Sequence, residues 1–166
     1  MKTEIATLAG GCFWGVEDIF RKTKGVLATQ VGYTGGTVPH PTYEQVCTQT
    51  TGHAEAVRVE FNSDVLPYEQ LLKLFFRLHD PTTLNRQGPD QGNSYRSAIF
   101  FHSKSQFKLA GEVIAWVEKQ GWWKDPIVTE VVEASAFFAA EEYHQKYFER
   151  HPDHASCHFL RTFEPA

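Results

Sequence analysis

The chain has 166 residues, 42% of them hydrophobic, and a formal net charge of −4. This length suffices to bury a core without disulfide or metal staples, so we expect one domain over residues 1–166, and the acidic balance argues against nucleic acid as the main partner. The beginning of the chain lacks the apolar run of a signal peptide and no stretch is apolar enough to span a bilayer, so we expect a cytoplasmic protein without a membrane partner.

Short strand-like and helix-like segments follow one another along the chain, separated by glycines and prolines. β-branched and aromatic residues mark the strands, and apolar residues at helical spacing mark the helices. Their order predicts a mixed α/β sheet with flanking helices, built around a split βαβ core. In chain order we predict strand 5–9, helix 16–24, strand 26–33, strand 56–61, helix 68–77, strand 97–101, helix 105–119, strand 127–134 and helix 139–149.

Two long loops interrupt this order, at residues 34–52 and 80–96. Long loops on a compact scaffold tend to carry function, so we expect site residues there. The last predicted helix, 139–149, places charged residues opposite aromatic ones, which indicates an amphipathic helix at the surface.

The most informative motif is Gly11-Cys12-Phe13-Trp14-Gly15, at the junction of the first strand and the first helix. We expect Cys12 to face the free backbone N–H groups of the helix's first turn, which would stabilise a nucleophilic thiolate. Small glycines relieve crowding around the sulfur, and Phe13 and Trp14 offer an apolar wall to a small group. The motif therefore predicts a reactive cysteine with a binding surface beside it.

Several polar residues could act together with this cysteine. Glu55 enters a strand between two alanines, and an inward side chain there would be a desolvated carboxyl that serves as an acid. Asp90 and Tyr95 come just before another strand, and Tyr43 lies in the first long loop. Taken alone, each has a structural alternative: an outward glutamate, an aspartate that caps a turn, and half-buried tyrosines with locally bonded hydroxyls.

Seven segments in this order resemble peptide methionine sulfoxide reductase of the A type, over almost the whole chain. The resemblance implies a mixed α/β sandwich around a ferredoxin-like core. It also implies reduction of the S epimer of methionine sulfoxide, free or in proteins, to methionine, which repairs oxidised proteins. The matching segments are Gly11–Gly15, Gly32–Gly36, Tyr43–Cys47, Thr51–Glu55, His79–Thr82, Asp90–Gly92 with Tyr95–Ser97, and Ala140–Gln145.

The resemblance also implies roles for the residues above. A sulfoxide sulfur is a poor electrophile until its oxygen is protonated, so Cys12 would attack while Glu55 donates a proton. Tyr43 and Tyr95 would donate hydrogen bonds to the sulfoxide oxygen, and Asp90 would act indirectly, through water. The S-methyl group would bind between the two aromatic residues of the cysteine motif, Phe13 and Trp14, with Tyr95 completing this substrate-binding pocket.

Oxygen transfer would leave a sulfenic acid on Cys12, which another thiol must resolve. Cys157 is the expected resolving cysteine, because the tail over 150–166 resembles the family's C-terminal resolving segment and could swing toward Cys12. Thioredoxin would reduce the resulting disulfide, no cofactor is expected to be bound, and the family suggests a monomer. In contrast to many relatives, this tail is poor in glycine. Cys47 is interpreted as a buried bystander.

Three other interpretations are open from the residues alone. Cys12 could be the nucleophile of an acyl-transfer enzyme, with His53 or His144 as base and Asp90 or Asn93 orienting it. The aromatic residues and the carboxyl could form a cage for a methylated ammonium or a peptide, without turnover. The tail could instead hold a metal ion through closely spaced side chains, namely His151, His154, Cys157 and His158.

Overall fold

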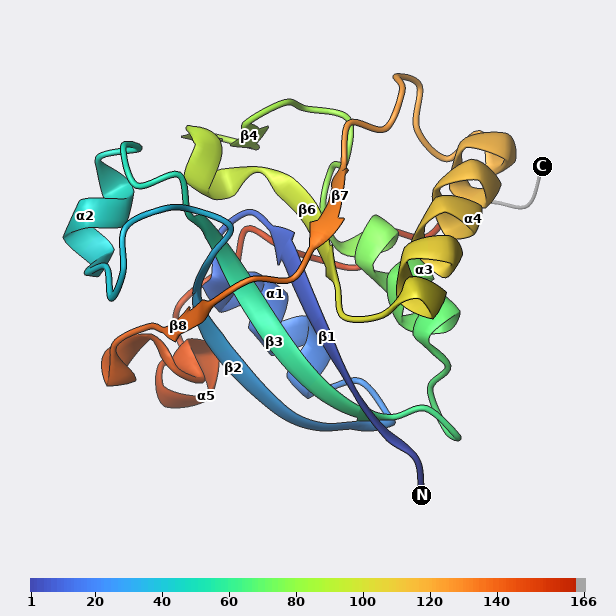
Figure 1. Ribbon diagram of the computed structural model, residues 1–166, viewed down its shortest axis with the longest axis horizontal. Helices are drawn as coiled ribbons and strands as arrows, with labels where there is room; N and C mark the ends of the chain where they lie inside the picture. Colours follow the sequence, from blue (N-terminus) through green and yellow to red (C-terminus); the bar gives the residue numbers. More distant parts are fainter. Residues whose placement is uncertain (164–166) are drawn as a thin grey trace.

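The computed structural model describes residues 1–163 of the chain, and its centre is a mixed β-sheet (Figure 1). The strand order is β7-β6-β1-β3-β2-β8. All neighbours are antiparallel except β6 and β7, which are parallel because α4 connects them. A two-stranded ladder of β4 and β5 lies apart from this sheet. The strands are β1 (Thr3–Gly10), β2 (Val26–Thr34), β3 (Ala54–Asn62), β4 (Arg86–Gln87), β5 (Asp90–Gln91), β6 (Ser97–Phe101), β7 (Glu130–Glu133) and β8 (Phe137–Ala139).

Three longer helices connect the strands, and several short ones lie in the loops. Helix α1 joins β1 to β2, α3 precedes β6, and α4 joins β6 to β7; α3 and α4 contact each other (Figure 1). The apolar side of α3, including Leu71 and Phe75, is fully buried in the core. The helices are α1 (Phe13–Arg21), α2 (Tyr43–Cys47), α3 (Tyr68–Leu78), α4 (Lys104–Gln120) and α5 (Tyr147–Arg150), with 3₁₀ turns η1 (Asn93–Tyr95) and η2 (Glu142–His144).

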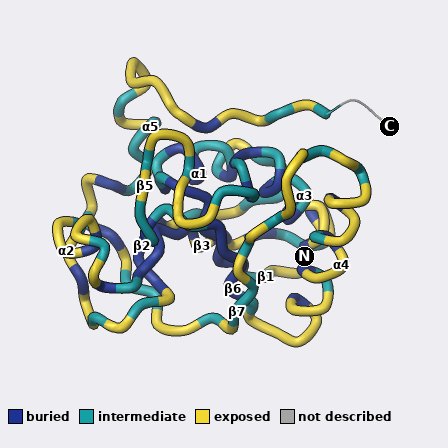
Figure 2. Tube along the Cα trace, turned by 90° about the horizontal axis from the view of Figure 1, so that it is seen from above, coloured by how far each residue is buried: buried dark blue, intermediate teal, exposed yellow. Residues whose placement is uncertain are grey.

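The main core lies between the sheet and these helices (Figure 2). Alternate residues of β3, such as Val57 and Val59, point into it, while Ala54 and Ala56 belong to a smaller cluster with Ala9. Within the described residues, no helix is both long and apolar enough to cross a membrane. The predicted mixed α/β fold is confirmed, and the two long loops carry α2 in one case and β4, β5 and η1 in the other.

The predicted helix over 139–149 is wrong. Strand β8 extends to Ala139, a 3₁₀ turn follows, and only the four residues of α5 are helical. The side chain of Gln145 explains the difference, because it accepts a hydrogen bond from Val31 N (2.9 Å) and donates to Val31 O (2.9 Å) and Ala140 O (3.0 Å). Lys146 has a positive φ of 52°, which interrupts a right-handed helix.

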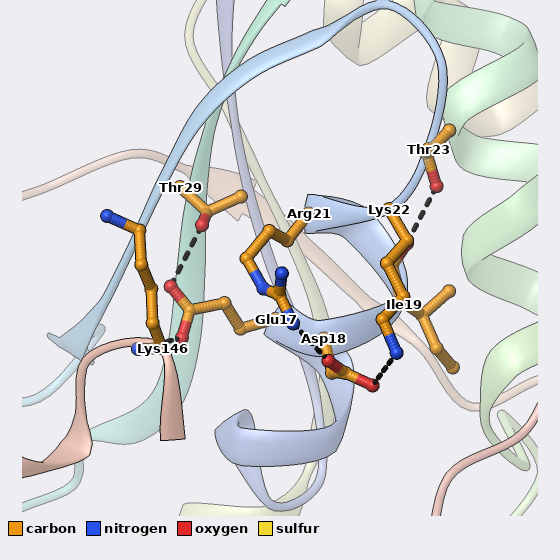
Figure 3. A network of polar contacts seen from close by, with 8 residues as sticks. All are labelled: Glu17, Asp18, Ile19, Arg21, Lys22, Thr23, Thr29 and Lys146. Atoms are coloured by element: carbon orange, nitrogen blue, oxygen red, sulfur yellow. Dashed lines mark hydrogen bonds and ion pairs between the residues drawn. The ribbon is translucent and has the colours of Figure 1, made fainter. Parts of the chain in front are cut away.

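Glu17 of α1 fastens this same segment to the sheet (Figure 3). Its carboxylate accepts the backbone N–H of Lys146 at 2.7 Å and the hydroxyl of Thr29 in β2 at 2.9 Å. Only 1% of Glu17 is exposed, and burial raises the pKa of its carboxyl. One buried side chain thus joins α1, β2 and the segment before α5.

We expect Glu17→Ala to lower the free energy of unfolding by about 2 kcal/mol, because it removes a buried side chain that accepts two part-buried hydrogen bonds. Urea titration followed by circular dichroism measures this loss. Glu118→Ala on the exposed side of α4 is the control and should change stability by less than about 0.5 kcal/mol. An equal effect of both variants would show that the Glu17 hydrogen bonds contribute nothing.

Candidate active site

Cys12 is the residue that caps the N-terminus of α1, directly after the turn that follows β1. The turn requires Gly11, whose φ is 98° and where a Cβ would lie 2.6 Å from Gln87 Cγ. The Cys12 side chain makes no capping hydrogen bond, but the backbone N–H groups of Trp14 and Gly15 act to lower the pKa of its thiol. The sequence therefore predicted the placement of Cys12 at the helix N-terminus.

Glu55 of β3 points inward, toward the start of α1. Its residue is 2% exposed, and its Oε1 accepts the backbone N–H of Phe13 at 3.2 Å. Burial, with a smaller contribution from the charge of Asp90, raises the pKa of Glu55 to about 8. The carboxyl is therefore mostly neutral at pH 7, and the alternative of an outward, solvated glutamate is wrong.

The expectation that the helix N-terminus makes Cys12 a thiolate is not met. Burial, reinforced by the charge of Glu55, raises the pKa of the Cys12 thiol to about 12. The N–H groups of Trp14 and Gly15 act in the opposite direction but are outweighed. Cys12 is consequently a protonated thiol beside a protonated carboxyl.

Two tyrosines and an aspartate complete the same cluster. Tyr43 begins α2 and Tyr95 ends η1, and both are half-buried. Burial raises the pKa of each tyrosine, and the charge of Glu55 adds to this effect, so both hydroxyls remain donors. Asp90 of β5 raises the pKa of Cys12, Glu55 and Tyr95 through its charge. The two long loops thus deliver the three side chains that the sequence singled out there.

The aromatic pair after Cys12 takes two different positions. Phe13 is fully buried, whereas Trp14 is half-buried and stacks on Tyr147 of α5 with centroids 3.7 Å apart. Trp14 Nε1 donates to Nδ1 of His144 at 2.9 Å. His144 also lies against Phe13 and Tyr43, with ring centroids 5.2 and 4.5 Å apart. Sequence reasoning missed this support, for which the only signal was the histidine's place in the Ala140–Gln145 segment.

The two histidines considered as acyl-transfer bases have other partners. His144 is occupied by Trp14, and His53 accepts from Gly36 N at 3.0 Å through Nδ1 while its Nε2 donates to Val38 O at 2.7 Å. Neither contact includes Cys12. The arrangement therefore does not supply the cysteine–histidine pair that acyl transfer needs.

The other two cysteines lie at the surface. Cys157 is exposed, and no disulfide joins the three cysteines, all of which are described. Cys47 is also exposed, so the expectation that it is buried is wrong, while its role as a bystander stays a prediction. It ends the short α2, whose one buried residue is Val46.

The tail histidines do not converge on one point. His151 and His154 stack on each other with centroids 4.8 Å apart, while His158 binds the carbonyl of Gly10. Over residues 1–163, no group of three or more His, Cys, Asp or Glu side chains could hold a metal ion. The metal-site interpretation of the tail therefore has no support in the described part of the chain.

A half-buried thiol beside a neutral carboxyl, with two tyrosyl donors, can attack a substrate through sulfur while a neighbouring group donates a proton to it. A family model described as peptide methionine sulfoxide reductase matches residues 4–164. The chain belongs to this family, and it is a methionine sulfoxide reductase of the A type.

Individual relatives agree with the family model. The peptide methionine sulfoxide reductase MsrA of Methanosarcina acetivorans is 58% identical over 147 residues, which cover 89% of this chain and 78% of the relative. The crystal structure of Mxr1 from Saccharomyces cerevisiae in reduced form is 38% identical with a TM-score of 0.89, covering 97% of this chain and 93% of that one. Mxr1 in complex with Trx2 is also similar, at 28% identity and a TM-score of 0.65, covering 97% and 91%.

We expect Cys12 to be the slowest of the three cysteines to react with iodoacetamide at pH 7.5 in the ligand-free protein. Its thiol is protonated and largely buried, whereas Cys157 and Cys47 are exposed. A time course with peptide mapping measures the three rates. Faster alkylation of Cys12 than of Cys157 would contradict the raised pKa, and urea-unfolded protein should show no such order.

Proposed function

We propose that the chain reduces the S epimer of methionine sulfoxide, free or in proteins, to methionine by thiol chemistry at Cys12. The single observation that carries this proposal is the neutral carboxyl of Glu55 beside the thiol. A sulfoxide needs a proton on its oxygen before a sulfur nucleophile can attack, and Glu55 holds that proton at neutral pH. The activity would repair oxidised proteins.

The first step transfers an oxygen atom. The Cys12 sulfur attacks the sulfoxide sulfur, Glu55 gives its proton to the oxygen, and the thiol proton passes to Glu55. The oxygen then passes to the Cys12 sulfur as the S–O bond of the substrate and the transient S–S bond both break, which leaves methionine and a sulfenic acid on Cys12. The methionine sulfur is reduced by two electrons and the Cys12 sulfur is oxidised by two, so no further reactant is required.

Two tyrosines orient the oxygen in this mechanism. Their raised pKa values keep the hydroxyls of Tyr43 and Tyr95 protonated, so both can donate hydrogen bonds to the sulfoxide oxygen. Asp90 acts without direct contact, through water. The S-methyl group binds at Phe13, Trp14 and Tyr95, and a fixed methyl pocket with a fixed oxygen site accepts one epimer only.

The second step removes the sulfenic acid. Cys157 attacks the Cys12 sulfur, and a disulfide forms with loss of water. A thioredoxin then reduces this disulfide through thiol–disulfide exchange. The exposure of Cys157 supports this assignment, as does the likeness to Mxr1, which has been solved in complex with Trx2. In this proposal the whole chain is one reductase domain that acts as a monomer in the cytoplasm, with 150–166 as its resolving tail and no bound cofactor.

The experiment that tests the proposal mixes fully reduced protein with methionine S-sulfoxide and no reductant. We expect one equivalent of methionine and an intact mass that falls by two hydrogens, with Cys12 and Cys157 linked in the digest. An unchanged mass in folded, reduced protein would refute the reductase mechanism. The R epimer is the control and should give no methionine.

Two substitutions separate the cysteine roles. Cys12→Ser should form no methionine, because the nucleophile is missing. Cys157→Ser should form one equivalent, gain one oxygen and then stall with thioredoxin as the reductant. Normal cycling of Cys157→Ser with thioredoxin would assign resolution to another thiol, and Cys47→Ser is the matched control that should cycle normally.

Glu55→Gln should slow the single-turnover rate by about 10²–10⁴-fold with little change in substrate affinity, because the amide cannot donate the proton. In the unmodified enzyme the protonated carboxyl is the active form, so kcat/KM should fall as the pH rises through about 8. Rapid-quench kinetics between pH 6 and pH 9.5 measures both effects. Glu60→Gln, on the same strand but exposed, should leave rate and profile unchanged. A wild-type rate in Glu55→Gln would remove this residue from the acid role.

A further inference from the structure

The segment that carries Cys157 is exposed chain with one buried side chain in it. Figure 2 shows the tail passing over α1 as a largely exposed segment without regular secondary structure. Cys157 is exposed and Phe159 is 59% exposed, but His158 between them is only 9% exposed. The buried His158 side chain therefore attaches this part of the tail to the rest of the protein.

The His158 side chain packs against two glycines, Gly10 before Cys12 and Gly15 after it. Its Nε2 donates to the carbonyl of Gly10 at 2.7 Å, a contact that is buried and spans 148 residues of sequence. A Cβ on Gly15 would lie only 2.5 Å from His158 Nδ1 and 2.7 Å from Ser156 Oγ. The absence of a side chain at Gly15 therefore lets residues on both sides of Cys157 contact the first turn of α1.

The imidazole is neutral and acts through its shape and one hydrogen bond. Burial lowers the pKa of His158, and the bond to Gly10 requires the proton on Nε2. Nδ1 is buried and has no hydrogen-bond partner within residues 1–163. The ring therefore does not act as the base of Cys157, because its only lone pair faces Gly15.

We propose that His158 is a positioning residue that holds Cys157 beside Cys12 for the resolving step. The inference rests on the proposed function, in which Cys157 attacks the sulfenic acid of Cys12. In that step an S–S bond forms, the S–O bond breaks, and the oxygen leaves as water with the proton of Cys157. The Cys157 sulfur is oxidised and the Cys12 sulfur reduced, so the two cysteines balance each other.

The tail has a second attachment, which makes the role of His158 separable. Arg161 N donates to Arg77 O at 3.0 Å, Arg77 Nε donates to Arg161 O at 2.8 Å, and Phe163 stacks on Trp122 with centroids 4.7 Å apart. Without the His158 contact, the tail stays bound to α3 while the residues around Cys157 are released. The attack then loses the advantage of a fixed geometry, which is worth orders of magnitude in comparable intramolecular reactions.

The test follows two steps separately in reduced protein with methionine S-sulfoxide and no reductant. Methionine release reports oxygen transfer, and quenched samples analysed by intact mass report the disulfide. In His158→Ala we expect methionine release at the wild-type rate, a disulfide rate that falls about tenfold or more, and accumulation of the species that carries one extra oxygen. His158→Gln keeps an N–H donor for the Gly10 carbonyl and should recover part of the rate.

His154→Ala is the matched control, because it also removes an imidazole from the tail but leaves the contacts of His158 with Gly10 and Gly15 intact. This variant should behave as wild type. A wild-type disulfide rate in His158→Ala overturns the inference, as does an equal slowing of both steps. Should His158→Ala not fold, His158→Asn, whose amide is too short to reach Gly10, gives the same comparison. If the unmodified protein forms no methionine, the proposed function itself fails. If it forms methionine but keeps the oxygen instead of forming the disulfide, the assignment of Cys157 as the resolving cysteine fails.

Discussion

The burial of the Glu55 carboxyl beneath the first turn of α1 determines the chemistry of everything around it. Glu55 shares its face of β3 with Val57 and Val59, which is the face that the helices cover. A carboxylate in that place loses its hydration, and a single N–H from Phe13 restores only part of it. The group therefore keeps its proton at neutral pH.

The same burial decides the state of Cys12, because desolvation and the helix N-terminus act in opposite directions. The pKa of the thiol is raised from 9.0 to about 12, which corresponds to roughly 4 kcal/mol against the thiolate. Backbone N–H groups at a helix N-terminus contribute about 0.3–1 kcal/mol in exposed sites and up to about 2 kcal/mol when partly buried. Burial outweighs them, so both Cys12 and Glu55 hold their protons at neutral pH.

Local sequence rules predicted each strand of the described main sheet except β8, and three of the four helices that they proposed are present. They worked where a pattern repeats, as along β3 or α3, and where a glycine-flanked cysteine ends a strand. The helix over 139–149 failed because Gln145 satisfies the backbone of Val31, a contact across 114 residues. The prediction that Cys12 is a thiolate failed for a related reason, since desolvation depends on which distant elements cover a side chain.

The glycines around Cys12 are required for packing, but the side chains that they accommodate come from distant segments of the chain. The sequence suggests that they relieve crowding at the sulfur, yet the space they leave holds distant side chains: His79 beside Gly10, Gln87 beside Gly11 and His158 beside Gly15. Each of these side chains belongs to a segment other than α1.

In the proposed mechanism, a resolving cysteine must satisfy two requirements that conflict, since it has to reach the half-buried sulfur of Cys12 and yet be open to an external reductant. A long glycine-rich tail can meet them by moving between two positions. This chain combines an exposed cysteine with a buried neighbour, so Cys157 stays accessible while His158 fixes the backbone beside α1. In the proposed mechanism, a glycine-poor tail is therefore compatible with resolution, because anchoring one residue away from the thiol supplies proximity without burying the sulfur.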